Sequence, residues 1–506
     1  MRKLFSVLFL FKWLRYLYTL AFILLFSYSS YAEYSFSTNC RNAYQCLVSL
    51  KIDEAHKYIL AEKISAPKNL LPSYLENFSE FLVCVLDEDR NYFEKCKKNE
   101  EPRIEAWENS DDNSPFRIYI IAETRLQWAL LKAKFGDPLG AALDLNSSYR
   151  WYQKNQELYP NFAPNKKGLG ILHTLFSLIP DEYSWLFKIL GYKGSLRQGL
   201  SELVNAFVQT HIYPEYKFLR TELLFIISFI HINLINQQKD LESIKKHMIA
   251  EGSDQPLLLF ARVNIEMKSG QNNAALTLME SRPRSNEYHP FYYLDYLEGI
   301  ARLNQLDLSA INHFEFFLSH YKGYNYIKSA LQKIAWCYLL NENRTKYTEF
   351  IQKISTAGSV LVDEDKQAQK EFALKIPPNV VLLKARLLCD GGYYEKALST
   401  LTDKNNLLKI TSEQDLLELQ YRMGRIFHKL KKIAEAISYY EKTIIAGKDK
   451  PYYFAANAAL ELGIIYEEKK NYSAARKNYN LCLSMKNHEY RNSLEQKAKA
   501  GLSRIP

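Results

Sequence analysis

A repeated spacing in the last third of the chain constrains the fold more than any other sequence feature. Small residues recur every 39 positions, at Ala385, Gly424 and Gly463. An alanine follows each of them 12 positions later, at Ala397, Ala436 and Ala475. A constant period of this size indicates an array built from copies of one supersecondary unit.

The spacing inside each copy fits a hairpin of two antiparallel helices. A large apolar residue stands three positions after the small one, at Leu388, Phe427 and Tyr466. Another stands four positions after the alanine, at Leu401, Tyr440 and Tyr479. We expect the small residue to admit the second helix, the large residue to fill the gap, and the alanine to lie at the helix crossing.

The composition supports an all-helical chain. The 506 residues include only 18 glycines and 16 prolines, about 7% together, where roughly 12% is usual. Sandwiches and barrels need a turn signal every 8 to 12 residues or so, and this sequence lacks them. The predicted fold class is therefore all-α, a solenoid of helical hairpins.

The repeat resembles the tetratricopeptide repeat (TPR), lengthened by about five residues from its usual 34, with Gln420 and Ala459 where that motif has tryptophan. Weaker copies precede it, as Leu258/Ala261/Ile265 with Ala274/Leu278, Leu294/Leu297/Ala301 with Ala310/Phe314, and Leu331/Ala335/Tyr338 with Tyr347/Ile351. The resemblance implies a superhelix whose first helices line a concave groove that binds a partner.

Helix punctuation and polar breaks predict the domain organisation. Capping signals occur at Ser114-Pro115, Ser195 and Thr411, and residues 363–378 predict a loop or an additional helix. We expect four segments: a signal peptide at 1–32, an N-terminal helical region at 33–110, a central helical region at 111–250 and a TPR-like array at 251–506.

The N-terminus has the pattern of a secretory signal. Four cations and no acid accompany the apolar run 16–28, and small residues at Ser30 and Ala32 fit a cleavage site. We expect an exported protein in the periplasm or cell envelope of a Gram-negative bacterium; the alternative is a signal retained as an anchor. Removing 1–32 lowers the formal charge from +10 to +6, too small a surplus to predict a nucleic-acid partner.

The seven cysteines form no metal-binding pattern, because no C-x-x-C occurs. In an oxidising compartment a Cys40–Cys46 bridge is one option. Cys337, Cys389 and Cys482 lie in helical apolar patterns and are expected to be buried thiols.

The central region departs from the repeat with Pro-Asn-Lys-Lys-Gly-Leu-Gly at 164–170, followed by apolar stretches at 171–180 and 183–191. With residues 74–77 and 126–129, this box resembles exported TPR proteins of Gram-negative bacteria of unassigned function. A fainter resemblance, through 168–180 and 189–194, is to the eukaryotic TPR family linked to inclusion-body clearance and lipid handling. Neither resemblance implies catalytic residues.

Two interpretations of this region stand side by side. Lys166 and Lys167 at a helix N-terminus suggest an anion site, whereas the two glycines suggest close helix packing, with His173 a hydrogen-bonded interior residue; we favour packing. The apolar stretches suggest lipid handling, but Lys188 is their only cation, and interfacial helices are usually cation-rich. Membrane contact is therefore not favoured, and the apolar residues predicted to be core are Leu175, Phe176, Leu186 and Ile189.

No catalytic motif occurs: there is no H-E-x-x-H, G-x-S-x-G or P-loop. We therefore expect no enzyme, no cofactor and no metal. The leading interpretation is a scaffold that binds a protein or peptide partner in its groove, where Tyr421, Arg425 and His428 form a candidate patch. The alternative is lipid or membrane-surface handling through the 168–195 hairpin.

Overall fold

The computed structural model describes residues 34–110, 112–177, 194–235, 238–252, 255–488 and 490–506. These residues form helices joined by short turns, and none of them lies in a strand. The all-α prediction is thereby confirmed. The predicted signal peptide and the second apolar stretch, with Leu186 and Ile189, lie outside the described residues.

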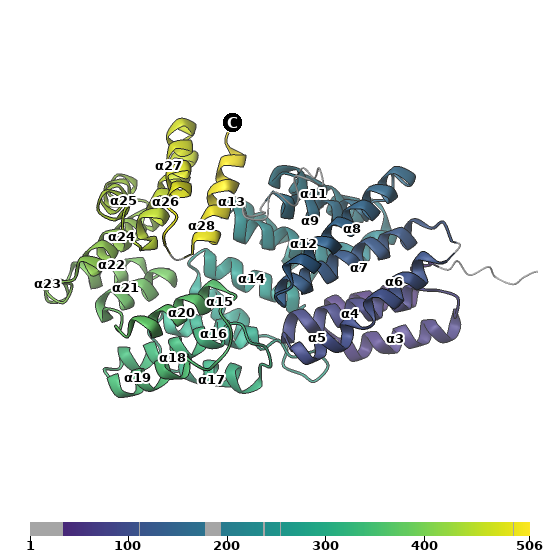
Figure 1. Cartoon of the computed structure of the whole chain (residues 1–506), viewed down its shortest axis with the longest axis horizontal. Helices are drawn as coiled ribbons and strands as arrows, with labels where there is room; N and C mark the ends of the chain where they lie inside the picture. The colour runs from purple at the N-terminus through teal and green to yellow at the C-terminus, as the bar shows by residue number, and fades with distance from the viewer. Residues whose placement is uncertain (1–33, 111, 178–193, 236–237, 253–254, 489) are drawn as a thin grey trace, which may run out of the picture.

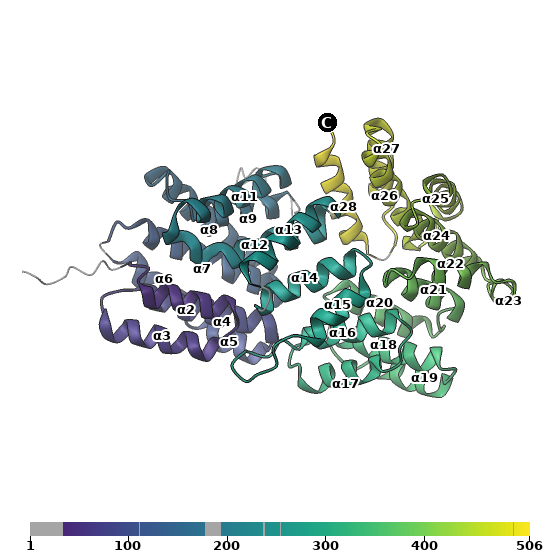
Figure 2. The same cartoon turned by 180° about the vertical axis from the view of Figure 1, so that it is seen from behind.

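Two lobes lie side by side along the long axis of the molecule (Figures 1 and 2). The N-terminal lobe contains α2 (Thr38–Val48), α3 (Ile52–Ser65), α4 (Leu71–Asp87), α5 (Arg90–Lys97), α6 (Glu100–Glu108), α7 (Pro115–Lys134), α8 (Pro138–Leu158), α9 (Asn165–Phe176), α11 (Leu196–Ile212), the 3₁₀-helix η1 (Pro214–Leu219), α12 (Arg220–Ile230), the π-helical turn η2 (His231–Ile235) and α13 (Gln238–Glu251).

The C-terminal lobe is a succession of hairpins that ends in a single helix. It contains α14 (Pro256–Lys268), α15 (Asn272–Glu280), α16 (Tyr293–Asn304), α17 (Ala310–His320), α18 (Ile327–Leu340), α19 (Arg344–Lys353), α20 (Asp363–Leu374), α21 (Val380–Asp390), α22 (Tyr394–Thr402), α23 (Lys404–Leu407), α24 (Glu413–Lys429), α25 (Ile433–Gly447), α26 (Tyr453–Glu468), α27 (Tyr472–Ser484) and α28 (Arg491–Arg504). The polar break at 363–378 thus holds an additional helix, α20.

The 39-residue copies are the hairpins α21/α22, α24/α25 and α26/α27. All three alanines of their second helices, Ala397, Ala436 and Ala475, are fully buried. The small residue of the first helix lies under the ring of the second, because a Cβ on Gly463 would stand 2.5 Å from the Tyr479 ring. The equivalent distance from Gly424 to the Tyr440 ring is 2.7 Å.

In the two hairpins that have a glycine, the predicted gap-filling role belongs to a different residue, whereas Leu388 of α21 is buried as predicted. Tyr440 and Tyr479, on the second helices, cover the glycines and are fully buried. Phe427 and Tyr466, three positions after the glycines, are only partly buried. The alanine and the tyrosine are four positions apart, slightly more than one helical turn, so both face the first helix.

The upstream copies have the same geometry, with one correction of register. In α16/α17, Ala301, Ala310 and Phe314 are fully buried, as the pattern predicts. In α15 the buried residues are Ala275 and Met279 rather than Ala274 and Leu278. The buried Asn272 side chain donates to the Ala301 carbonyl at 2.8 Å and sets the rotation of this helix.

One cluster of buried apolar residues extends from Tyr34 to Ile265 and crosses residue 110 without a break. A second cluster begins at Leu259, in α14, and continues to Leu387. Helix α14 therefore contributes to both cores and joins the two lobes.

Two of the three predicted caps are confirmed and one shifts. The Ser114 and Ser195 hydroxyls accept backbone N–H groups at the starts of α7 and α11. At the start of α24 the cap is Ser412, not Thr411, and its hydroxyl accepts the Asp415 N–H. Ser412 has the extended backbone conformation that a cap residue requires.

All seven cysteines are free thiols, and Cys337, Cys389 and Cys482 are buried as predicted. The Cys40–Cys46 bridge is wrong, because both residues lie on α2, where six residues span about 9 Å along the axis, beyond disulfide reach. Instead, the thiols of Cys84 on α4 and Cys96 on α5 are hydrogen-bonded to each other.

Among the described residues, one helical segment, Pro214–Ile235, is long and apolar enough to cross a membrane. Inside this protein, 61% of its most apolar window is buried. That burial is typical of a core helix in a water-soluble fold.

Candidate functional site

The C-terminal lobe encloses a chamber of about 790 Å³. Its walls come from α12 and η2 of the N-terminal lobe, from α20 and α28, and from the first helices of the hairpins: α14, α16, α18, α21, α24 and α26. First helices line the concave side of a hairpin solenoid because each second helix packs behind its partner. The chamber is therefore the inner face of the superhelix.

Helix α28 closes this superhelix against the N-terminal lobe and lies between the lobes in Figures 1 and 2. The Arg504 guanidinium donates to the Leu234 carbonyl of η2 at 3.3 Å and forms an ion pair with Glu467 at 2.8 Å. At the other end of the helix, the Tyr490 hydroxyl donates to the Gln367 side chain on α20. The chamber thus depends on contacts between residues far apart in the sequence.

The backbones of two turns, after α14 and after α21, are in direct contact and hold the first and later hairpins of the C-terminal lobe together. A Cβ on Gly392 would overlap the Gly270 carbonyl, so the turn after α14 touches the turn after α21. Both glycines have positive φ, of +71° at Gly270 and +86° at Gly392. The Tyr393 hydroxyl donates to the Asn273 side chain at 2.6 Å across the same contact. Only glycine fits these positions without strain.

The chamber wall carries a marked excess of positive charge. Three acids line it: Glu364, Asp390 and Glu461. Eight basic residues line it: Lys268, Lys333, Arg386, Arg422, Arg425, Lys429, Lys497 and Arg504. The excess belongs to the chamber and not to the chain as a whole, whose net charge is small for its length.

The arginines of the wall have partners. Asp390 pairs with Arg425 at 2.9 Å and with Arg386 at 3.8 Å. Burial alone would raise the pKa of the Asp390 carboxyl, but the two guanidinium groups hold it below its usual value. Arg422 pairs with Glu418 at 2.8 Å. These ion pairs hold the arginine side chains of the wall in place.

The lysines differ from the arginines in this respect. Lys268, Lys429 and Lys497 have no ion-pair partner among the described residues. The Lys333 ammonium lies 3.7 Å from the centre of the Trp336 ring and donates to the Gln332 side chain, with no carboxylate in ion-pair range in the described chain. Carboxylates such as Glu364 act on these lysines from a distance, but none of them forms an ion pair with a wall lysine among the described residues.

Titration behaviour reflects this arrangement. Burial and the nearby Arg386 lower the pKa of Lys333 to about 7. Burial and the nearby Lys497 lower the pKa of Lys268 to about 8. Both shifts mean that the surroundings disfavour the charged ammonium. An anion in the chamber would reverse the effect.

Aromatic side chains give the wall rigidity. Seven tyrosines line the chamber: Tyr293, Tyr296, Tyr326, Tyr394, Tyr421, Tyr453 and Tyr490. Several rings pack on one another, such as Tyr293 on Tyr326 at 4.6 Å and Tyr421 on Tyr453 at 5.8 Å between ring centres. Their mutual packing holds them in place with or without a ligand.

The structure brings two of the three predicted groove residues to this chamber. Tyr421 lines it, although the side chain is buried and its hydroxyl accepts the Asn457 amide at 2.7 Å. Arg425 lines it beside Asp390, whereas His428 is absent from the wall and faces Glu461 at 3.3 Å. The pattern of one helix could not reveal Lys268, Lys333 and Lys497, which come from other hairpins.

The anion-site interpretation of the Lys166-Lys167 pair is wrong, because Lys167 is fully buried. Its ammonium lies 2.8 Å from both Glu123 and Glu222. A Cβ on Gly168 would overlap the Tyr152 ring, so the glycine serves helix packing as favoured. His173 is the hydrogen-bonded interior residue expected, with Glu202 at 2.6 Å.

The carboxylates around Lys167 have other donors as well. The Tyr44 hydroxyl donates to Glu222, and the Tyr152 hydroxyl donates to Glu123. Burial raises the pKa of Glu222, opposed by the Lys167 ammonium. The cluster is saturated with internal contacts and serves the core of the N-terminal lobe.

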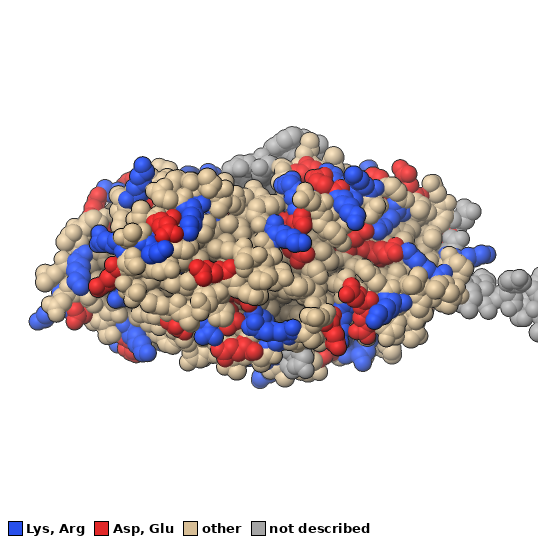
Figure 3. Space-filling model, turned by 90° about the horizontal axis from the view of Figure 1, so that it is seen from below, with Lys and Arg blue, Asp and Glu red and all other residues tan. Residues whose placement is uncertain are grey.

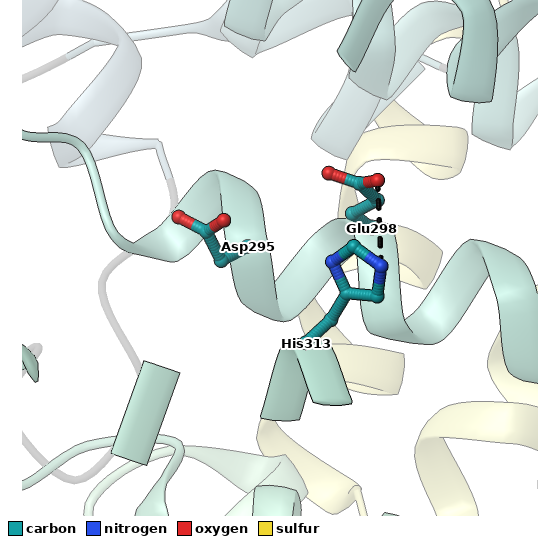
Figure 4. Close-up of side chains that lie close together, drawn as sticks. All are labelled: Asp295, Glu298 and His313. Carbon is teal, nitrogen blue, oxygen red and sulfur yellow. Dashed lines mark ion pairs between the residues drawn. The ribbon is translucent and has the colours of Figure 1, made fainter. Parts of the chain in front are cut away.

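A group of potential metal ligands, Asp295, Glu298 and His313, also proves to be structural (Figure 4). The Arg282 guanidinium binds both Asp295 and Glu298, the latter at 2.8 Å. Arg302 reaches Glu298 at 3.1 Å. Two guanidinium groups already neutralise the carboxylates, so the residues do not suit a divalent cation.

The described half of the apolar hairpin packs into the protein. The prediction that Leu175 and Phe176 are core residues requires both to be fully buried. The structure shows them only partly buried, packed against the core of the N-terminal lobe. The other half, 178–193, lies outside the described residues.

A family model described as Iml2/Tetratricopeptide repeat protein 39 matches residues 38–300. No curated protein matches the chain. Among solved structures, the human IFIT1 dimer with PPP-AAAA is similar at 14% identity, covering 82% of this chain and 96% of that one, with a TM-score of 0.36. Cut9–Hcn1, an APC/C hetero-tetramer, is similar at 10% identity, covering 90% and 95%, with a TM-score of 0.26.

Proposed function

Because the chain belongs to the Iml2/Tetratricopeptide repeat protein 39 family, we propose that it is a non-enzymatic scaffold that binds a protein or peptide partner in the chamber of its C-terminal lobe. The observation that carries the proposal is the chamber itself, a concave space of about 790 Å³ lined by six first helices. Cavities of this size and shape are typical of ligand sites.

The design of the wall supports binding rather than catalysis. Its charged groups come from several different hairpins, as in solenoids that present a concave surface to a partner. Its arginines are committed to carboxylates, and its tyrosines pack on one another.

We also propose export to the periplasm or cell envelope of a Gram-negative bacterium, on the sequence of 1–32 alone. Fractionation and mass determination of the mature chain test it. A processed product in the envelope fraction is expected, and an unprocessed cytosolic product would contradict it. Lipid handling remains a prediction for the 168–195 hairpin, and no observation of the described residues favours it over partner binding.

Photo-crosslinking tests where the partner binds. A benzoylphenylalanine in place of Ser493, which lines the chamber, should capture a partner in cells. Ser503, exposed on the same helix α28, is the matched control position. Adducts from Ser493 and none from Ser503 support the chamber as the site, and the reverse pattern would contradict it.

A further inference from the structure

We infer that the partner segment in the chamber is acidic: a stretch of peptide rich in glutamate or aspartate, held by Lys268, Lys333, Lys429 and Lys497. This inference rests on the proposed function and adds the chemistry of the partner to it.

Each of the four lysines comes from a different helix. Lys268 ends α14, Lys333 lies in α18, Lys429 ends α24, and Lys497 lies in α28. Folding brings them to one cavity and leaves them without an ion pair among the described residues. Lys333 is buried and Lys497 half-buried, whereas Lys268 and Lys429 are exposed at the wall. Like charges that share one cavity repel each other and favour an accompanying anion.

The acids of the wall do not supply that anion. Asp390 is bound by Arg425 and Arg386. Glu461 lies 3.3 Å from the His428 ring, and Lys429 and Lys497 act on it only from beyond ion-pair range. Glu364, at the start of α20, is the one wall carboxylate without an ion pair in the described chain, and a single carboxylate cannot balance four ammonium groups.

A peptide suits the chamber better than a nucleic acid. Nucleic-acid binding depends on basic surface that follows a phosphate backbone over many nucleotides. On the face seen in Figure 3, basic and acidic side chains are interspersed and no basic track is visible. The unbalanced charge is confined to a chamber of about 790 Å³, which suits a short acidic segment.

Binding of a labelled hexaglutamate peptide to the full chain, measured by fluorescence anisotropy, tests the inference. The triple variant Lys268→Gln/Lys429→Gln/Lys497→Gln should bind at least tenfold more weakly. Lys409→Gln/Lys469→Gln/Lys477→Gln changes the net charge equally at exposed sites outside the chamber and should bind like the wild type. Hexaglutamine should not bind, and added salt should weaken hexaglutamate binding.

A variant that is expected to bind more tightly separates a loss of binding from a folding defect. Glu364→Gln removes the unpaired carboxylate of the wall, so hexaglutamate should bind two- to fivefold more tightly. Equal affinity of the triple variant and its control would overturn the inference. So would tripolyphosphate that displaces the peptide at a lower concentration than unlabelled hexaglutamate, because the site would then favour phosphate.

The failure of this inference is distinguishable from failure of the proposed function. If Ser493 still captures the same partner in the triple lysine variant, the chamber binds a partner but not through the lysines, and only the acidic assignment falls. If no partner is captured from Ser493 in the wild type, the proposed function itself is wrong.

Discussion

The two lobes differ in whether their lysines form ion pairs. In the N-terminal lobe, Lys167 lies between Glu123 and Glu222, and tyrosine hydroxyls complete the cluster. In the C-terminal lobe, four lysines line one cavity, and none of them has an ion-pair partner among the described residues. Where helices pack closely, charge is paired because the core would otherwise not form. Where the superhelix leaves a chamber, water and a ligand can take the partner's place.

The largest effect is expected from Lys167→Met. This change leaves two carboxylates in the core without their cation and should lower the free energy of unfolding by about 3 to 5 kcal/mol. Urea denaturation followed by circular dichroism measures it. Lys166→Met, one position earlier, is the control: this half-buried lysine donates to the neutral Asn205 side chain, and its loss should cost less than about 1 kcal/mol. Equal losses would remove the contrast between the lobes.

Glycine substitutions compare how tightly the lobes are packed. Gly168→Ala in the N-terminal lobe places a methyl group in the Tyr152 ring, and Gly463→Ala in the C-terminal lobe places one 2.5 Å from the Tyr479 ring. Each should destabilise the protein by about 1 to 3 kcal/mol, because buried rings give way poorly. Thermal unfolding measures both. A neutral Gly463→Ala would mean that the chamber walls are more adaptable than the N-terminal core.

Stability should depend on pH through Lys333. Burial and Arg386 lower its pKa to about 7 from 10.5, against the carboxylates of Glu371, Glu364 and Asp365 that favour its charge. Between these two pH values the unfolded chain binds more protons, so stability rises with pH. From pH 7 to pH 9 the wild type should gain about 1 to 2 kcal/mol relative to Lys333→Met. A flat difference between the two proteins would show that Lys333 has its ordinary pKa.

The smallest effect concerns the stability of the empty chamber. Lys497→Met removes one of two neighbouring cations, because Lys497 contributes to the lowered pKa of Lys268. The variant should be more stable than the wild type by about 0.5 kcal/mol at low salt. Denaturation at low and high salt measures the change, which should shrink as salt screens the repulsion. Destabilisation would indicate that Lys497 has a partner in the folded chain.

Much of the fold follows from local patterns. The sequence predicted the 39-residue period, the burial of the second-helix alanines and the caps Ser114 and Ser195. Each of these features depends on residues within about two helical turns or one hairpin. The one-residue shift at Ala275 was not predictable, because the buried Asn272 side chain binds a carbonyl of the next hairpin and rotates α15.

The candidate site was predictable only in part, and the reason is geometric. The sequence by itself predicted Tyr421 and Arg425 as groove residues, because they lie on a first helix opposite the packing face of the repeat, and both line the chamber. The lysines were decided by tertiary structure alone. Lys268 and Lys497 are 229 residues apart, and they meet because successive hairpins rotate by a small angle each and because α28 then docks on η2. Such rotations accumulate along a solenoid, and no local spacing of residues encodes their sum.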